Sequence, residues 1–425
     1  MTEFGNREDS GQHGEASLLR DFRLLLYLFI GFRLMMLVVY QPMIIDDVER
    51  GVTAGGDMRY YYALGAFSDE GLLPFRDFWS EFPPVWPTLY VAAYRLTALG
   101  GGPNYTAFAS LMGLLMLAFD TGNLILLRRI GARLYGPDVG LALAWVYAVL
   151  LAPAVFLWWT FETMLAFWLL LSVWWLLYRR DDRSAAAALI GGLTKFVPLL
   201  MLGAVWRFRD WRSALRYTLI AVGGFALIYA VVIAATGLMG AVSLWAQSSK
   251  SSYGTVWALI DGNYTTGVFG TLQSHFDPAE ASRPLHNPAV IPGWLRLIAF
   301  GGFGLYAFWQ TRRRDDRAVV MFVTLTLLVF FLWAQGWSPQ WLALIIPLVL
   351  LSFPGRDGVL AILLLSMVVF TEYPLLFIRT GDTGGMITGA LLPGFVALVL
   401  ARTAILVGLV GALFLRLRRP VVTVE

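Results

Sequence analysis

Acidic and basic side chains gather in a few short stretches of this apolar chain. One of these side chains, the carboxylate of Asp57, is of a type that can accept a proton in a reaction. Asp57 follows Gly55-Gly56 and precedes Met58-Arg59-Tyr60-Tyr61-Tyr62. The tyrosines predict a short interfacial helix, because tyrosine is favoured at a membrane boundary. Two interpretations of Asp57 are open. In the first, it caps this helix, since Asp is a preferred N-cap residue. In the second, it is a general base, and the two glycines before it allow a substrate to come close.

Further charged residues flank Asp57. The pair Asp46-Asp47 can hold a cation or an acceptor hydroxyl, or it can be a solvated boundary. Arg76 can contact a substrate or pair with a neighbouring acid such as Asp77 or Glu81. The candidate substrate-binding residues of this segment are Asp46, Asp47, Arg59, Tyr61, Arg76 and Glu81, and the candidate catalytic residue is Asp57.

Isolated charges occur later in the chain. Glu162 lies among aromatic residues, where a carboxylate is costly without a partner or a role. Lys195 is the only charge between residues 184 and 206, so it needs an anion, for which Glu162, Asp57 or a ligand phosphate qualifies. Lys250 is a solvated loop charge or a second phosphate contact. Arg379 stands where positive charge is unusual and can face an anion.

The sequence gives little support for a metal site or a nucleotide site. The chain has no cysteine, and its three histidines are scattered without metal-ligand spacing. No phosphate-cradling glycine loop or nucleotide fingerprint is present. We therefore predict neither a metal site nor a cofactor. A divalent cation is compatible with the chemistry but has no support in the sequence.

The elements that position these residues are predicted by composition. Of the 425 residues, 58% are hydrophobic and only 14% are charged. A soluble protein of this size could not cover its surface with so few charges. Apolar runs recur that approach the roughly 20 residues needed to cross a bilayer. The fold class is therefore an all-α polytopic membrane protein. Its excess of arginine lies at the ends of apolar runs and indicates topology, not a nucleic-acid partner.

The arginine clusters predict the orientation of these runs. Apolar segments occur at about 22–44, 105–127, 139–157, 160–178, 184–194, 196–206, 214–236, 291–310, 318–335, 338–353, 358–378 and 386–415. Counting the short segments 184–194 and 196–206 as crossings, they give about 12 membrane crossings. If both termini are cytosolic, every arginine cluster between them falls on the cytosolic side, as the positive-inside bias requires.

This topology divides the chain into a cytosolic tail (1–20), one transmembrane catalytic domain (21–419) and a second cytosolic tail (420–425). Residues 45–104 form a first outer loop with juxtamembrane helices, and residues 237–292 form a second long outer loop. The segment Pro83–Leu99 is a surface or half-inserted helix. Segments 184–194 and 196–206 are half-helices that meet near Lys195, an arrangement tolerated where it lines a cavity or is buried in protein.

Several short patterns follow one another along the chain. After Asp57 with Tyr60 and Tyr61 come Pro74-Phe75-Arg76-Asp77-Phe78 and Glu81-Phe82-Pro83-Pro84, then Arg128-Arg129-Ile130-Gly131, Lys195-Phe196-Val197-Pro198-Leu199 and Trp337-Ser338-Pro339-Gln340-Trp341. In this order they resemble the GT-C superfamily of membrane glycosyltransferases. The branch they resemble most is family 87, the polyprenol-phosphate-mannose-dependent mannosyltransferases.

The resemblance implies a GT-C-like fold and a catalytic site on the external face of the cell membrane. Asp57 would be the general base, Lys195 would contact the donor phosphate, and Gln340 would lie near the cavity. The donor would be a polyprenyl-phosphate sugar, mannose or a similar hexose or pentose, and the acceptor a lipid or a glycan. Related chains carry an arginine followed by Glu-Ser in the second outer loop, whereas this chain has Lys250 and Tyr253, so the donor is left open.

Two other function classes remain as alternatives. A secondary transporter or a flippase for lipid-linked sugars has a similar number of spans, but transporters often show internal repeats and polar groups at the midplane. This chain shows no clear repeat, and its acids lie at the predicted outer edge. A non-catalytic assembly subunit would use the acidic loop to contact a partner.

Overall fold

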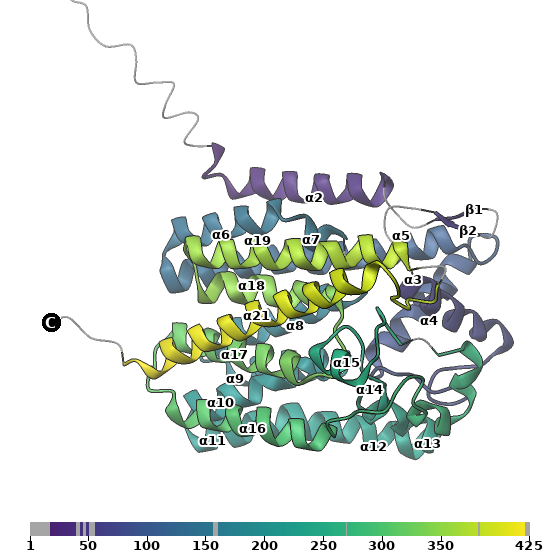
Figure 1. Ribbon diagram of the computed structural model, residues 1–425. Helices are drawn as coiled ribbons and strands as arrows, with labels where there is room; N and C mark the ends of the chain where they lie inside the picture. The colour runs from purple at the N-terminus through teal and green to yellow at the C-terminus, as the bar shows by residue number, and fades with distance from the viewer. Residues whose placement is uncertain are drawn as a thin grey trace, which may run out of the picture.

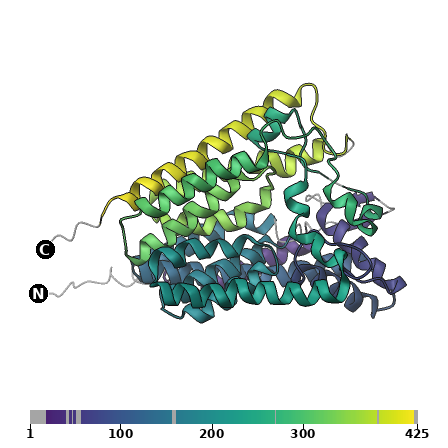
Figure 2. The ribbon, with the colours of Figure 1, turned by 90° about the horizontal axis from the view of Figure 1, so that it is seen from below.

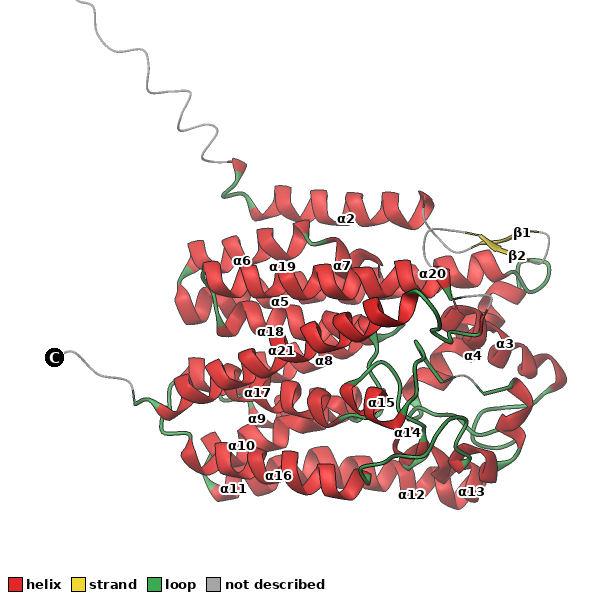
Figure 3. Ribbon diagram, in the orientation of Figure 1, coloured by secondary structure: helices red, strands yellow, loops and turns green. Residues whose placement is uncertain are grey.

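The computed structural model describes residues 18–39, 43–45, 48–50, 56–155, 160–268, 270–380 and 383–420. Over these ranges, long helices run roughly alongside one another, and short helices and loops gather at one end of the bundle (Figure 1). Helices dominate the described chain, as Figure 3 shows by its colours.

Each apolar run of the sequence contains at least one helix over its described residues. The bundle consists of α2 (Phe22–Val39), α5 (Tyr105–Tyr135), α6 (Pro137–Val149), α7 (Leu151–Val155), α8 (Glu162–Leu177), α9 (Asp181–Gly192), η2 (Val197–Leu200), α10 (Met201–Phe208), α11 (Trp211–Thr218), η3 (Leu219–Gly223), α12 (Gly224–Thr236), α16 (Gly293–Gln310), α17 (Asp316–Trp333), η7 (Pro339–Trp341), α18 (Leu342–Ser352), α19 (Arg356–Phe370), η8 (Thr371–Leu376), α20 (Phe377–Arg379) and α21 (Leu391–Arg418). Here η3 and η8 are π-helical turns within longer helices.

The remaining elements are short. They are β1 (Met43–Ile45), β2 (Val48–Arg50), α3 (Gly56–Ala66), η1 (Phe67–Glu70), α4 (Val85–Ala98), α13 (Leu238–Ala241), η4 (Val242–Leu244), α14 (Ala246–Ser249), α15 (Val256–Asp261), η5 (Leu272–Phe276) and η6 (Pro278–Ser282). The antiparallel pair of β1 and β2 departs from the all-α prediction. Its β-branched residues Ile44, Ile45 and Val48 favour extended backbone. The predicted carboxylate pair Asp46-Asp47 lies outside the described residues.

Six helices of the described chain are long and apolar enough to cross a membrane: α2, α5, α11 through α12, α17, α19 through α20, and α21. Four shorter apolar helices accompany them, at Pro137–Val149, Glu162–Leu177, Val197–Phe208 and Pro339–Ser352. These helices support the interpretation of the chain as a membrane protein. The count of about 12 crossings stays a prediction, because the shorter helices fall below the usual spanning length of roughly 20 residues.

The arginine clusters meet at one end of the bundle. Arg133 at the end of α5 donates to Leu177 O at 2.9 Å and to Asp316 at 2.7 Å. Arg416 near the end of α21 donates to Ser352 O at 3.2 Å. The start of α2 and the end of α21 lie at this same end (Figures 1 and 2). This arrangement agrees with the predicted arginine pattern, and the side of the membrane that this end faces stays a prediction.

The opposite end holds α3, α4 and the loops around α13 to α15 (Figure 1). Here α9 and η2 form a tight hairpin whose turn carries Lys195. A Cβ on Gly191 would lie 2.7 Å from Pro198 Cγ, and one on Gly192 would lie 2.9 Å from Leu199 Cγ. These glycines therefore allow the two half-helices to approach closely. Val85 at the start of α4 donates its amide to Leu193 O at 3.0 Å, which places this turn beside α4.

Candidate active site

Helix α3 is held against α4 by aromatic packing. The ring of Tyr61 lies 5.1 Å from that of Trp86, nearly perpendicular to it, and 5.7 Å from that of Tyr90. Gly65 fits against Tyr94, because a Cβ there would lie 2.8 Å from Tyr94 Cβ. Tyr61 is buried in this contact. Tyr61 therefore packs α3, the helix that carries Asp57, against α4, and its predicted contact with a substrate stays a prediction.

Asp57 is half-buried in the first turn of α3 and makes no hydrogen bond or ion pair with any other described residue. Burial is the main cause that raises its pKa to about 7. The carboxylates of Glu162 and Glu81 add to this rise, whereas Lys250 and Lys195 oppose it. A carboxyl group with a pKa near neutrality can take up and release a proton under cellular conditions. The geometry thus leaves the general-base interpretation of Asp57 open to test.

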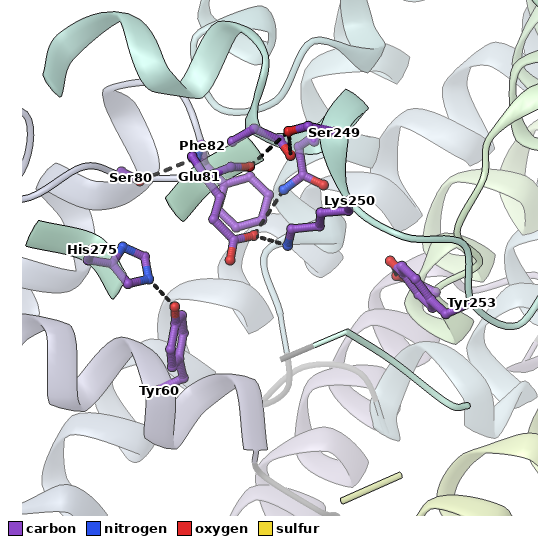
Figure 4. Close-up of polar contacts among 12 residues, drawn as sticks. Tyr60, Ser80, Glu81, Phe82, Ser249, Lys250, Tyr253 and His275 are labelled. Atoms are coloured by element: carbon purple, nitrogen blue, oxygen red, sulfur yellow. Dashed lines mark hydrogen bonds and ion pairs between the residues drawn. The ribbon is translucent and has the colours of Figure 1, made fainter. Parts of the chain in front are cut away.

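Glu81 forms an ion pair with a residue of the second long loop. Lys250 Nζ donates to Glu81 Oε2 at 2.6 Å, and Gln247 Nε2 donates to the same oxygen at 3.0 Å (Figure 4). Burial alone would raise the pKa of Glu81, but the charge and hydrogen bond of Lys250 hold it below its ordinary value. Burial alone would lower the pKa of Lys250, yet Glu81 raises it. Both partners are therefore charged at neutral pH.

A second ion pair joins α8 to the turn between α9 and η2. Lys195 Nζ donates to Glu162 Oε1 at 2.7 Å, and Thr160 Oγ1 donates to Glu162 Oε2. Of the three anions open to Lys195 in the sequence, the structure therefore selects Glu162. The side chain of Glu162 is 1% exposed and that of Lys195 is 17% exposed. Lys195 also lies 5.4 Å from the rings of Phe82 and Phe161.

Gln340 lies beside this region in η7. Its side chain is 6% exposed, and its Oε1 has no hydrogen-bond partner among the described residues. The next residue, Trp341, has its ring 5.9 Å from Lys195 Nζ. An unpaired buried oxygen is costly, so Gln340 is a position where a ligand hydroxyl or a water molecule would be stabilised.

A glutamine clamps the segment that carries Lys250. Gln335 Nε2 donates to the carbonyl oxygens of Gln247 at 3.3 Å, Ser248 at 3.2 Å and Lys250 at 2.5 Å. Arg296 donates to Gln335 Oε1 at 3.4 Å from the opposite side. The position of Lys250 is therefore set by a residue just after α17, which ends at Trp333.

A tyrosine–histidine contact joins the segments 45–104 and 237–292, and sequence reasoning missed it. His275 Nδ1 lies 2.6 Å from Trp79 O, and its Nε2 contacts the hydroxyl of Tyr60 (Figure 4). A carbonyl oxygen only accepts, so Nδ1 carries the proton and Tyr60 donates to Nε2. Burial lowers the pKa of His275, which agrees with a neutral ring. No local pattern signals this contact, because its partners are 215 positions apart in the sequence.

Two predicted substrate-binding residues lie away from the ion pairs. Arg76 is exposed, pairs with Asp77 at 2.8 Å and donates to Gly71 O at 2.6 Å, so it closes its own loop. Arg59 is exposed on α3 and forms no hydrogen bond or ion pair with another described residue. Among the described residues, no group of three or more His, Asp or Glu side chains is placed to hold a metal ion.

Comparisons with known proteins give limited information. A search of protein-family models finds no match, and a search of curated proteins finds none either. Among solved structures, the chain is similar to the Archaeoglobus fulgidus oligosaccharyltransferase tethered to an acceptor peptide, with a TM-score of 0.42 and 13% sequence identity. The match covers 95% of this chain and 55% of that one, so this chain spans about half the length of that enzyme.

Proposed function

We propose that the protein is an integral membrane glycosyltransferase that transfers a sugar from a polyprenyl-phosphate donor to a lipid or glycan acceptor on the external face. The observation that supports this proposal best is Asp57. It is a half-buried carboxyl group without a partner among the described residues, and burial raises its pKa to about 7. The ordered motifs that resemble the GT-C superfamily, and the helices long enough to span a membrane, agree with it.

The proposed reaction is a single displacement. The acceptor oxygen attacks the anomeric carbon of the donor sugar, and the bond from that carbon to the phosphate oxygen breaks. The bonding pair leaves with the polyprenyl phosphate, and the acceptor hydroxyl proton passes to Asp57. A carboxylate within hydrogen-bond reach of the attacking hydroxyl is suited to this proton transfer. The leaving phosphate stays in the membrane, which requires a site at the lipid–water boundary.

The charged residues of the site determine which groups can contact the departing phosphate. The two lysines balance Glu81 and Glu162, so ionised Asp57 leaves a net charge of −1 on these five residues. An ammonium group has three N–H donors, and Lys195 uses one of them on Glu162. Its other donors are proposed to contact the donor phosphate, with Lys250 as a second contact. Gln340 is proposed to bind a sugar hydroxyl through its unpaired Oε1.

The test is transfer from radiolabelled polyprenyl-phosphate mannose, and then from other polyprenyl-phosphate hexoses and pentoses, by purified protein in lipid vesicles. Asn has nearly the size and shape of Asp, but its neutral amide is not a proton acceptor of this kind. We therefore expect Asp57→Asn to lower transfer roughly 100-fold or more, the usual scale for a general base. The matched control is Glu70→Gln, an exposed acid of the same loop, at unchanged melting temperature.

The alternative is a secondary transporter or flippase, and the same vesicles separate the two. A flippase moves the labelled lipid across the bilayer with its sugar–phosphate bond intact. If the wild type does this without releasing polyprenyl phosphate, or if a well-folded Asp57→Asn protein transfers sugar normally, the proposed reaction is wrong.

A further inference from the structure

A groove opens on the outside of the bundle between η8 and the start of α21. It has a cavity volume of about 350 Å³, and its walls include Leu375, Leu376, Leu391, Phe395 and Leu398. Both walls belong to helices that are long and apolar enough to span a membrane, Arg356–Arg379 and Leu391–Arg418. Leu375 is 53% exposed, so the groove is open to the surroundings of the bundle.

One cation lines this apolar groove. Arg379, the last residue of α20, is exposed and forms no ion pair or hydrogen bond with another described residue. Most arginine clusters lie at the other end of the bundle, so a lone arginine here is not explained by the positive-inside bias. An apolar groove with a cation at the end of a span is complementary to a molecule that has a hydrocarbon chain and an anionic headgroup.

We propose that this groove binds an anionic phospholipid, with an acyl chain along the leucine-lined wall and its phosphate on Arg379. The groove lies away from the proposed catalytic residues: none of Asp57, Lys195 and Lys250 lines it. Figure 2 shows α21 and the α3–α4 region on opposite flanks of the molecule. For this reason the occupant is a lipid of the bilayer and not the sugar donor.

The groove wall also contacts the loop that carries Lys250. Glu372, within η8, forms an ion pair with Arg402 of α21, and both side chains are 2% exposed. Arg402 also donates to Gly254 O and lies 4.3 Å from the ring of Trp337. The lipid would therefore stabilise the pairing of η8 with α21 that holds the end of this loop. Binding itself does not depend on the proposed transfer reaction, so it can be tested separately.

The experiment is native mass spectrometry of the purified protein titrated with phosphatidylglycerol or phosphatidylcholine. One arginine near an anionic headgroup contributes about 1 kcal/mol. We therefore expect Arg379→Gln to reduce phosphatidylglycerol retention about fivefold. Phosphatidylcholine retention should fall less, because the choline cation offsets the charge of its phosphate. The matched control is Arg283→Gln, an exposed arginine of the second long loop that pairs with Glu280.

A second variant tests the acyl chain. A Cβ on Gly394 would meet no other atom within 4 Å, so Gly394→Trp can fill the groove from α21 without a clash at its base. It should reduce retention of both lipids. The proposal is overturned if Arg379→Gln retains phosphatidylglycerol like the wild type, if Arg283→Gln loses as much, or if a polyprenyl phosphate displaces the bound phospholipid one for one.

Discussion

Two buried ion pairs join distant parts of the chain, and their surroundings differ. Arg33 of α2 donates to Asp120 of α5 at 2.5 Å, and both side chains are 0% exposed. Tyr147 donates to the other Asp120 oxygen at 2.5 Å, and Arg33 lies 3.5 Å from the ring of Phe29. In the second pair, Lys195 of the α9–η2 turn keeps 17% of its side chain exposed. The first pair is sealed and the second is accessible.

The sealed pair has a structural explanation. Helix α2 lies at the edge of the bundle (Figure 1) and buries only Leu25, Phe29, Arg33 and Leu37, one residue per turn. So narrow a stripe buries little apolar area, and the bond of Arg33 to Asp120 fixes its register against α5. The accessible pair lies among the charges that set the pKa of Asp57. Burial of a charge therefore does not identify a site, whereas a charged donor that remains partly exposed to a ligand is a candidate.

The largest expected effect is on the sealed pair. Asp120→Leu leaves the Arg33 guanidinium buried without its carboxylate, which typically costs about 3–5 kcal/mol of unfolding free energy. The double variant Arg33→Met/Asp120→Leu should recover most of this loss, because neither charge is then left alone. Thermal unfolding in detergent measures both. Loss of sugar transfer per folded molecule at unchanged stability would instead place this pair in the reaction.

The accessible pair should respond in binding more than in stability. Lys195→Met removes the ammonium proposed to contact the donor phosphate. It also leaves the buried Glu162 carboxylate without its cation, so some unfolding free energy is lost as well, and the kinetics are compared per folded molecule. A hydrogen bond to a charged group contributes about 1.5–3 kcal/mol, so KM for the donor should rise roughly 10- to 150-fold with a smaller change in kcat. Glu162→Gln is the matched comparison, since it removes the negative charge beside Lys195 and keeps the positive charge of Lys195 itself. Normal turnover of Lys195→Met at limiting donor would make the pair purely structural.

A third pair, Glu81–Lys250, tests whether accessibility is the distinguishing property, because both of its side chains are also partly exposed. Gln335→Leu removes the donor to three carbonyl oxygens around Lys250. Loss of ordinary hydrogen bonds of about 0.5–1.5 kcal/mol should lower transfer roughly twofold to tenfold. The double variant with Lys250→Met should be no slower than Lys250→Met alone. Additive losses would show that Gln335 acts elsewhere.

Much of the fold follows from local sequence signals. Each apolar run contains a helix over its described residues, and the turn at Lys195 was expected because the arginines on both sides must share one end of the bundle. Hydropathy and charge are properties of short segments, so they can be recognised without tertiary contacts. The strand pair β1–β2 was missed because its β-branched residues directly follow the long apolar run of α2.

The site was less predictable because its contacts join segments far apart in the sequence. Lys250 and Glu81 are 169 positions apart, and no local pattern relates them. For Lys195 the sequence left three anions open, and the choice of Glu162 depends on how α8 packs beside α9. His275 was set aside for lack of metal-ligand spacing, whereas its structural role depends on Trp79 and Tyr60.

The smallest expected effect is a shift in pH dependence, and it separates the two buried pairs without breaking the fold. A general base works when deprotonated, so transfer should fall as the pH drops through about 7, the value to which burial raises the pKa of Asp57. Glu162 raises this pKa and Lys195 lowers it. Glu162→Gln should therefore move the midpoint of the kcat/KM profile to lower pH, and Lys195→Met should move it to higher pH. The double variant Arg33→Met/Asp120→Leu, which replaces the sealed pair, should leave the midpoint in place, since neither residue is among the charges that shift the pKa of Asp57. Profiles measured between pH 5 and 9 on folded protein test this, and equal midpoints in all three variants would show that Asp57 is not the titrating group.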